Sequence, residues 1–240
     1  MIDVQARPHQ LSIEHGGVRS AVHFDFQVVI AVVRHRPAGG CQQPLRLVQT
    51  ICDEVDLILV THDHLDHFDA GLVRQYLQAN PKTRIASTSQ VTAKLSDLKE
   101  QVITLNARQG KTDQVIVNEI QVKAYFLSHD KEAGDVINYG YLITINDILF
   151  FHAGDFNDSA GALSVLKTYQ LDQEGIDVAF VPYWLLPLFT IDSDNDRIGS
   201  KHIFPIHYQF YDVQFIKELY HPQAIFFDYN LQSWIMPEEE

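Results

Sequence analysis

A dense cluster of imidazole and carboxylate side chains lies in one short segment, which reads His62-Asp63-His64-Leu65-Asp66-His67. In an extended or turning backbone His62 and His64, two residues apart, project to the same side and can grip one metal ion. Asp66 and His67 fall at the entry to the next predicted helix and point to a neighbouring position. The segment therefore begins two metal sites, and each ion needs further ligands from later in the chain.

Three more ligand-type residues stand where such a site needs them, each just past a predicted apolar strand: His129, Asp155 and His207. Neutral imidazoles and carboxylates are the ligands that nitrogen- and oxygen-preferring metals require. Because the set contains no cysteine, zinc is the first choice, and manganese and iron are also compatible. We expect two divalent metal ions.

The elements that must position these residues alternate short β-branched strands with amphipathic helices, which is typical of sheets covered by helices. Strands are expected at 28–33, 56–61, 85–87, 102–105, 114–117, 120–127, 139–145, 148–152, 178–181, 203–206 and 224–227. Helices are expected at 70–79, 90–98, 159–169 and 212–220. Asp69 is the expected N-cap of the first helix. Asn118-Glu119 and Asn146-Asp147 are expected to join two hairpins.

The ordered ligand set resembles the metallo-β-lactamase superfamily of binuclear metallohydrolases over about residues 55–210. Segments 151–157 and 203–208 are similar to its lactonase-like branch, which contains ascorbate-6-phosphate lactonase relatives. The resemblance implies an α/β fold, a four-layer αββα sandwich with the metals at one edge. It further implies a first ion on His62, His64 and His129, a second on Asp66, His67 and His207, and Asp155 as the bridge. Members usually carry an aspartate before the histidine motif, and Asp25 is the residue that can take that place.

The chemistry expected of such a site is hydrolysis of a small ester-like substrate, a lactone or a phosphoester. Two ions about 3.5 to 4 Å apart can share a bridging water and lower its pKa towards about 7, which supplies hydroxide at neutral pH. Asp66 is expected to orient the attacking water. Asp63 and Asp130 can orient the ligand histidines beside them. The candidate substrate-binding residues, chosen because each lies near a ligand or a strand end, are His152, Tyr183, Trp184 and Tyr208.

Other functions stay open at this point: a phosphodiesterase or nuclease of the same fold, a redox protein using iron in the same frame, and a metal-stabilised binding protein without enzymatic activity. Taken singly, His129 or His207 is more often an ordinary, partly buried histidine, and it is the ordered set that favours ligands. Tyr183 and Trp184, with the apolar residues after them, can equally form core or a dimer face.

Composition limits the class of protein. The 240 residues fit a single domain over 1–240. A formal net charge of -13 argues against a nucleic-acid partner. We expect no membrane association, since no apolar run reaches the roughly 20 residues that cross a bilayer. Two cysteines and no leader sequence favour the cytoplasm. The expected partner is a small-molecule substrate, and a homo-oligomer is left open.

Overall fold

The computed structural model describes residues 9–15, 18–24, 29–35, 55–129, 135–157, 161–190, 198–208, 213–220, 223–226 and 233–235. The chain divides into two compact units, residues 1–104 with 227–240 and residues 105–226. Whether the chain is one domain, as expected from its length, stays a prediction. Among the described residues, no helix is long and apolar enough to cross a membrane.

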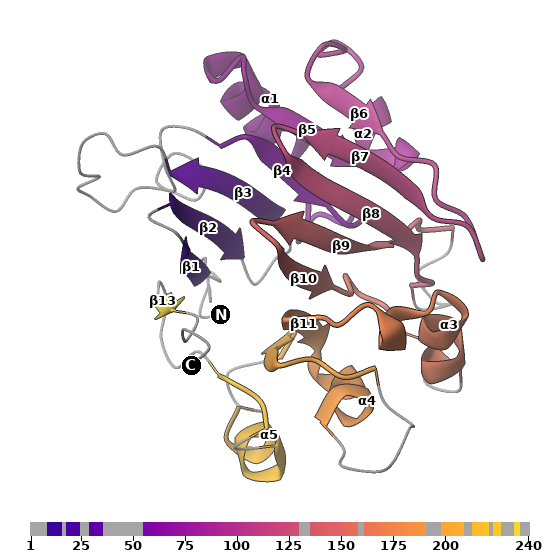
Figure 1. Ribbon diagram of the computed structural model, residues 1–240. Helices are drawn as coiled ribbons and strands as arrows, with labels where there is room; N and C mark the ends of the chain where they lie inside the picture. Colours follow the sequence, from indigo (N-terminus) through magenta and orange to yellow (C-terminus); the bar gives the residue numbers. More distant parts are fainter. Residues whose placement is uncertain are drawn as a thin grey trace, which may run out of the picture. The chain divides into compact units, whose positions relative to one another are not determined.

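The first unit is built on one mixed sheet with the strand order β13-β1-β2-β3-β4-β5-β6 (Figure 1). Its strands are β1 His9–His15, β2 Val18–Phe24, β3 Val29–His35, β4 Leu57–Val60, β5 Arg84–Ser87, β6 Val102–Thr104 and β13 Ser233–Ile235. The strands β1 to β4 pair antiparallel, whereas β4, β5 and β6 run parallel to one another. The carboxyl ends of β4, β5 and β6 therefore lie at the same edge of the sheet.

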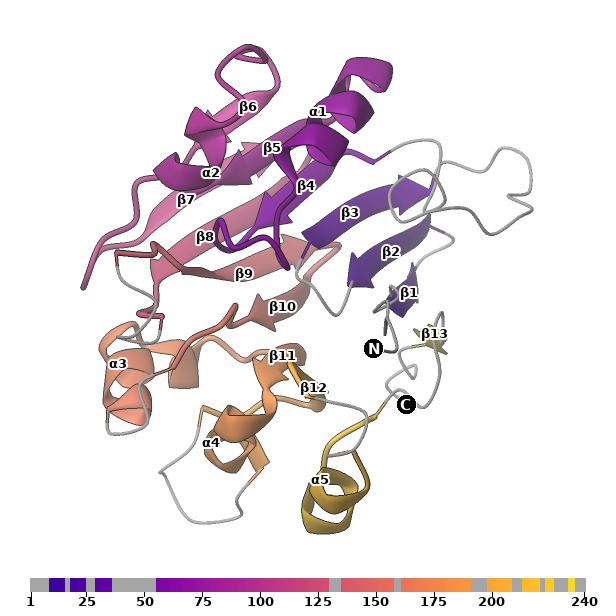
Figure 2. The same ribbon diagram turned by 180° about the vertical axis from the view of Figure 1, so that it is seen from behind.

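Two helices cover the parallel part of this sheet, α1 Ala70–Ala79 and α2 Ser89–Ala93, as Figure 2 shows. The α1 side chains Val73 and Leu77 pack with Ile58 of β4 and Ile85 of β5 in one buried apolar cluster. Burying each such side chain stabilises the fold by about 1.5 to 3 kcal/mol. Asp69 caps α1, because its Oδ1 accepts hydrogen bonds from the N–H groups of the first helical turn at 2.8 and 3.0 Å. The predicted helix and its cap are confirmed.

The second unit is built on a sheet with the order β12-β11-β10-β9-β8-β7. Its strands are β7 Asp113–Val117, β8 Ile120–Phe126, β9 Tyr139–Ile145, β10 Ile148–His152, β11 Val178–Pro182 and β12 His202–Ile206. Its helices are α3 Ala162–Thr168, α4 Leu186–Thr190, α5 Val213–Tyr220 and the short 3-10 helices η2 Leu171–Gln173 and η3 Tyr183–Leu185. One buried apolar cluster joins side chains of β8, β9, β10 and β11 to those of α3, η2 and α4.

Both predicted hairpins of the second unit are confirmed. Asn118 and Glu119 have φ angles of 48° and 69°, and Asn146 and Asp147 have 49° and 64°. Two successive residues of positive φ make the tight turn whose twist matches that of the flanking strands, and asparagine tolerates this conformation better than most residues. The turns place β8, β9 and β10 side by side in antiparallel order.

Two local predictions are wrong. The helix expected at 90–98 ends as α2 at Ala93 and continues into turns. The strand expected at 224–227 is absent over its described residues, 224–226. There the Ala224 N–H donates to Tyr220 O at the end of α5, and Ile225 N–H makes a single bond of 2.8 Å to Ile203 O of β12. A single hydrogen bond to β12 does not form a strand pair. The preceding donor, the Ala224 N–H, is already bonded to the end of α5.

Candidate metal centre

His62 stands where the buried strand β4 meets its loop. All four β4 residues are buried, and the chain stays buried through Thr61 and His62. The hydroxyl of Thr61 lies 3.0 Å from His62 Nδ1, within hydrogen-bond distance. A bond to one ring nitrogen fixes the orientation of the imidazole and directs its other nitrogen, which is how ligand histidines are commonly held.

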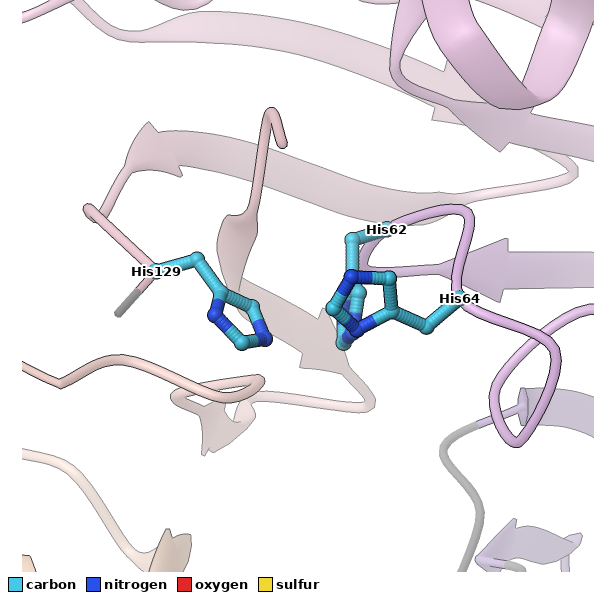
Figure 3. A group of neighbouring side chains, drawn as sticks. All are labelled: His62, His64 and His129. Carbon is cyan, nitrogen blue, oxygen red and sulfur yellow. The ribbon is translucent and has the colours of Figure 1, made fainter. Parts of the chain in front are cut away.

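The turn after β4 brings His64 and His67 next to His62. The N–H groups of His67 and Phe68 both donate to His64 O, at 3.0 and 2.8 Å, which curls the backbone before α1. The ring centroid of His62 lies 4.7 Å from that of His64 and 4.0 Å from that of His67. Figure 3 shows the His62 and His64 rings next to each other, carried by the same loop. The structure thus brings together the three histidines of the segment.

The two aspartates of this segment have different surroundings. Asp66 Oδ2 lies 3.5 Å from His67 Nε2, and the Asp66 side chain is 55% exposed. Asp63 Oδ2 forms an ion pair of 2.8 Å with Lys94 Nζ, just past α2. Asp63 therefore connects this loop to the end of α2, and its predicted orientation of a neighbouring histidine stays a prediction, whereas Asp66 is open to solvent. Asp25 and Asp130 lie outside the described residues.

In the second unit the predicted ligands gather at one edge of the sheet. The strands β8, β10, β11 and β12 all run in the same direction, because β9 is antiparallel to both β8 and β10 while β10, β11 and β12 are parallel. Their carboxyl ends therefore meet, and His129, Asp155 and His207 follow three of them. Asp155 Oδ2 lies 3.0 Å from His207 Nε2 and 3.6 Å from His129 Nε2.

Asp155 is the central group of this edge. Its side chain is 6% exposed, so its carboxylate has lost most of its water. A buried carboxylate is costly unless charges or hydrogen-bond donors compensate it, and here two imidazoles face the same oxygen. His207 has a φ of 61°, a left-handed conformation that is uncommon outside glycine and that directs its ring to Asp155. Such strain at a site is typical of a functional constraint.

Sequence reasoning missed Asn138, which lies just before β9. It is fully buried, its Oδ1 accepts from the Asp155 N–H at 3.2 Å, and its Nδ2 donates to Leu127 O at 3.1 Å. It thereby contacts both loops that carry ligands in this unit. The sequence signal was weak, since an asparagine before a strand is also an ordinary turn residue.

The four residues predicted to bind substrate lie around the same edge. His152 is buried, and its Nδ1 accepts from the Gly154 N–H at 2.9 Å, so the ring supports the turn that carries Asp155. Trp184 Nε1 donates to Phe156 O at 3.0 Å, and the Trp184 ring lies edge-on to His207 with centroids 5.0 Å apart. The Tyr183 ring is 5.2 Å from that of Trp184. These contacts place all three near predicted ligands, and their binding of substrate stays a prediction.

Tyr208 comes directly after His207, a predicted ligand. Burial raises the pKa of the Tyr208 hydroxyl to about 12, because the phenolate would lose its hydration. Its ring centroid lies 6.1 Å from that of Phe226. At neutral pH Tyr208 therefore keeps its proton and can act as a hydrogen-bond donor beside the ligand edge.

Each unit therefore presents nitrogen and oxygen donors of the kind that borderline and hard divalent ions accept. In the first unit these are three imidazoles with one carboxylate, and in the second two imidazoles on one carboxylate oxygen. The donor chemistry fits the divalent metal ions that the resemblance implies.

The comparisons with known proteins define the class. A model of the family described as "Beta-lactamase superfamily domain" matches residues 31–187, which include the histidine segment, Asp155 and β11. The chain belongs to this family. The predicted membership of the metallo-β-lactamase superfamily is thereby confirmed.

Two relatives of similar sequence are named metal-dependent hydrolases. The chain is similar to the UPF0173 metal-dependent hydrolase PH1671 of Pyrococcus horikoshii, 28% identical over 65% of this chain and 67% of the relative. It is also similar to a UPF0173 metal-dependent hydrolase of Thermococcus onnurineus, 30% identical over 65% of this chain and 67% of the relative.

A solved structure of similar fold is a protein of Parabacteroides distasonis, whose assignment as a metal-dependent hydrolase is itself provisional. It has a TM-score of 0.56 and 16% identity, and the match covers 96% of this chain and 98% of that one. At this identity the likeness concerns the fold alone. With the family match, it confirms the predicted α/β fold class of the metallo-β-lactamases.

Proposed function

We propose that this chain, a metal-dependent hydrolase of the β-lactamase superfamily, works with two divalent metal ions. The residues proposed to hold the first ion are His62, His64 and His129, those proposed for the second are Asp66, His67 and His207, and Asp155 would bridge the two. Figure 3 draws the side chains of the first group. Zinc is the first choice, and manganese or iron is compatible with these donors.

The observation that carries this proposal is the position of Asp155 Oδ2, at 3.0 Å from His207 Nε2 and 3.6 Å from His129 Nε2. A single carboxylate that faces two ligand histidines from separate strands is suited to bridge two ions. The three clustered histidines after β4 supply the remaining imidazoles. The names of the relatives, metal-dependent hydrolases, support metal dependence.

When bound, ions of this kind lower the pKa of water towards about 7 and polarise a carbonyl or phosphoryl oxygen. The residues of the chain then have separate tasks. The histidines and Asp155 would supply nitrogen and oxygen atoms that bind the ions. Asp66, whose side chain is 55% exposed, accepts a hydrogen bond from the attacking water and orients it. Tyr208, Trp184, Tyr183 and His152 would contact the substrate.

The proposed substrate is a small ester-like molecule, a lactone or a phosphoester. The net charge of -13 disfavours a nucleic-acid substrate, since proteins bind the phosphodiester backbone through basic surfaces. The lactone is suggested by the similarity of segments 151–157 and 203–208 to the lactonase-like branch. The cytoplasmic location expected from the sequence stays a prediction.

The test combines elemental analysis of the purified protein with a hydrolysis screen of lactones, phosphomonoesters, phosphodiesters and thioesters. We expect close to two metal ions per chain and turnover that a chelator abolishes. His64→Ala should lose metal and turnover together. The matched control is His202→Ala, which removes a histidine at the opposite end of β12 from His207 and should keep both.

Unchanged turnover in His64→Ala would show that the site is misassigned. Two bound ions without turnover on any substrate class would favour a metal-stabilised binding protein. Cleavage of phosphodiesters alone would favour the phosphodiesterase.

A further inference from the structure

The amino end of β9 lies between the two loops that carry ligands in the second unit. Because β9 is antiparallel to its neighbours β8 and β10, its first residues flank the last residues of both. The loop after β8 carries His129 and the loop after β10 carries Asp155. Asn138 immediately precedes β9 and so occupies the position between them.

The hydrogen bonds of the Asn138 amide connect the two loops. Its Nδ2 donates to Leu127 O at 3.1 Å and more weakly to Ala153 O at 3.5 Å, and its Oδ1 accepts from the Asp155 N–H at 3.2 Å. Its own carbonyl accepts from the Leu127 N–H at 3.1 Å. The two loops also bond directly, through Asn157 N–H to Ser128 O at 3.1 Å. Both ligands are thus within two residues of a bond from Asn138.

The turn after β10 is shaped around this amide. Gly154 has a φ of 57°, and a Cβ built on it would collide with Asn138 Oδ1 and lie 3.0 Å from Tyr139 O. The backbone therefore approaches the Asn138 side chain more closely than any other residue type at 154 would allow. His152 Nδ1 accepts the Gly154 N–H from the other side.

We propose that Asn138 is a positioning residue for the metal centre. Its side chain holds the loops after β8 and β10 together. His129 and Asp155 therefore lie at the distance that metal binding requires before an ion is bound. The inference rests on the proposed function, since it assumes that His129 and Asp155 are ligands. An amide is the group this position requires, because it must donate to carbonyl oxygens and accept from an N–H with one side chain.

A structural asparagine and a positioning asparagine differ in what their removal does to metal affinity. Loss of a buried polar contact destabilises the fold in either case. Loss of a group that orients ligands also weakens metal binding, commonly by 10- to 100-fold. The experiment therefore needs metal affinity and fold stability to be measured separately.

The experiment titrates the metal-free full chain with Co²⁺ and follows the ligand-field absorption, while thermal unfolding of the same metal-free samples reports stability. The variants are Asn138→Ala and, as the stability-matched control, Leu171→Ala, which empties part of the apolar cluster at η2. We expect Asn138→Ala to bind Co²⁺ 10- to 100-fold more weakly with an altered spectrum. Leu171→Ala should lose stability and keep the wild-type affinity and spectrum.

Equal Co²⁺ affinity in wild type and Asn138→Ala would overturn the inference and leave the proposed function intact. Failure of the wild type itself to bind Co²⁺ would reject the proposed function and the inference with it. If Asn138→Ala does not fold, Asn138→Asp replaces it, since it keeps the size and the acceptor and loses the donors. The inference then requires the same loss of affinity in Asn138→Asp.

Discussion

At the scale of single residues, the ligand edge of the second unit depends on unusual backbone conformations. Gly154 and His207 both have positive φ, at 57° and 61°. Glycine adopts this conformation at no steric cost, whereas histidine is strained in it. Each of these residues turns the chain directly at a proposed ligand. The geometry of the edge is therefore set by the backbone as much as by the side chains.

We predict that Gly154→Ala destabilises the fold more than Gly175→Ala. Both glycines have positive φ, 57° and 68°, so both substitutions add a left-handed alanine, at about 1 to 2 kcal/mol. A Cβ at Gly154 also collides with Asn138 Oδ1, whereas nothing lies within 4 Å of a Cβ at Gly175. Urea unfolding of the two variants measures the difference. Equal losses would mean that the turn relaxes and that the contact with Asn138 is dispensable.

At the scale of elements, the ligand loop of the first unit is held between β4 and α1. The β4 strand is buried on both sides and leads straight into Thr61 and His62. At the other end, α1 begins three residues after His67 and is fixed by the cap at Asp69. The histidine segment therefore has firm backbone on both sides, which limits the conformational entropy that metal binding must overcome.

We predict that Asp69→Ala lowers the free energy of unfolding by about 1 kcal/mol, because the first N–H groups of α1 lose their acceptor. Asp69→Asn keeps an oxygen in the same place and should retain most of the stability. Thermal unfolding of the metal-free protein compares the two. If Asp69→Asn were as unstable as Asp69→Ala, the carboxylate charge rather than the cap bonds would be what stabilises α1.

At the scale of the whole molecule, the proposed metal ions would neutralise part of the negative net charge of the chain. A formal net charge of -13 repels itself in the compact state. Two divalent ions would offset part of this charge and bind the folded chain in preference to the unfolded chain. Metal occupancy and stability should therefore change together.

We predict that removal of metal with a chelator lowers the unfolding temperature and that added Zn²⁺ restores it. Ligand at 100 times its dissociation constant stabilises a folded state by about 2.7 kcal/mol. Addition of Mg²⁺ to the same ionic strength should have little effect, since imidazoles are poor ligands for it. Zn²⁺ should also fail to restore His64→Ala. An equal response to Zn²⁺ and Mg²⁺ would indicate screening of surface charge and argue against a specific site.

Local sequence patterns were enough to predict several helices, turns and strands of this protein. The helix at 70–79 with its cap, both hairpins, the strands around the ligands and the superfamily were predictable from the sequence. The cap and the hairpins depend on residues close together in the chain: a cap bonds within three residues, and a turn depends on two. The superfamily was recognised from the ordered ligand set between His62 and His207. The strand predicted at 224–227 was wrong because its hydrogen bonds are decided by α5 and β12, which the local pattern does not contain.

Contacts between residues far apart in the chain were decided by the tertiary structure alone. Asn138 contacts Leu127, 11 residues away, and Asp155, 17 residues away, because β8, β9 and β10 pair as they do. The positive φ of His207 could not be predicted from the sequence, since a residue other than glycine rarely adopts this conformation. Trp184 likewise gained its hydrogen bond to Phe156 O, 28 residues away, from strand ends that the fold brings to one edge. Residue types reveal which groups can bind a metal, whereas strand pairing determines which groups hold them in place.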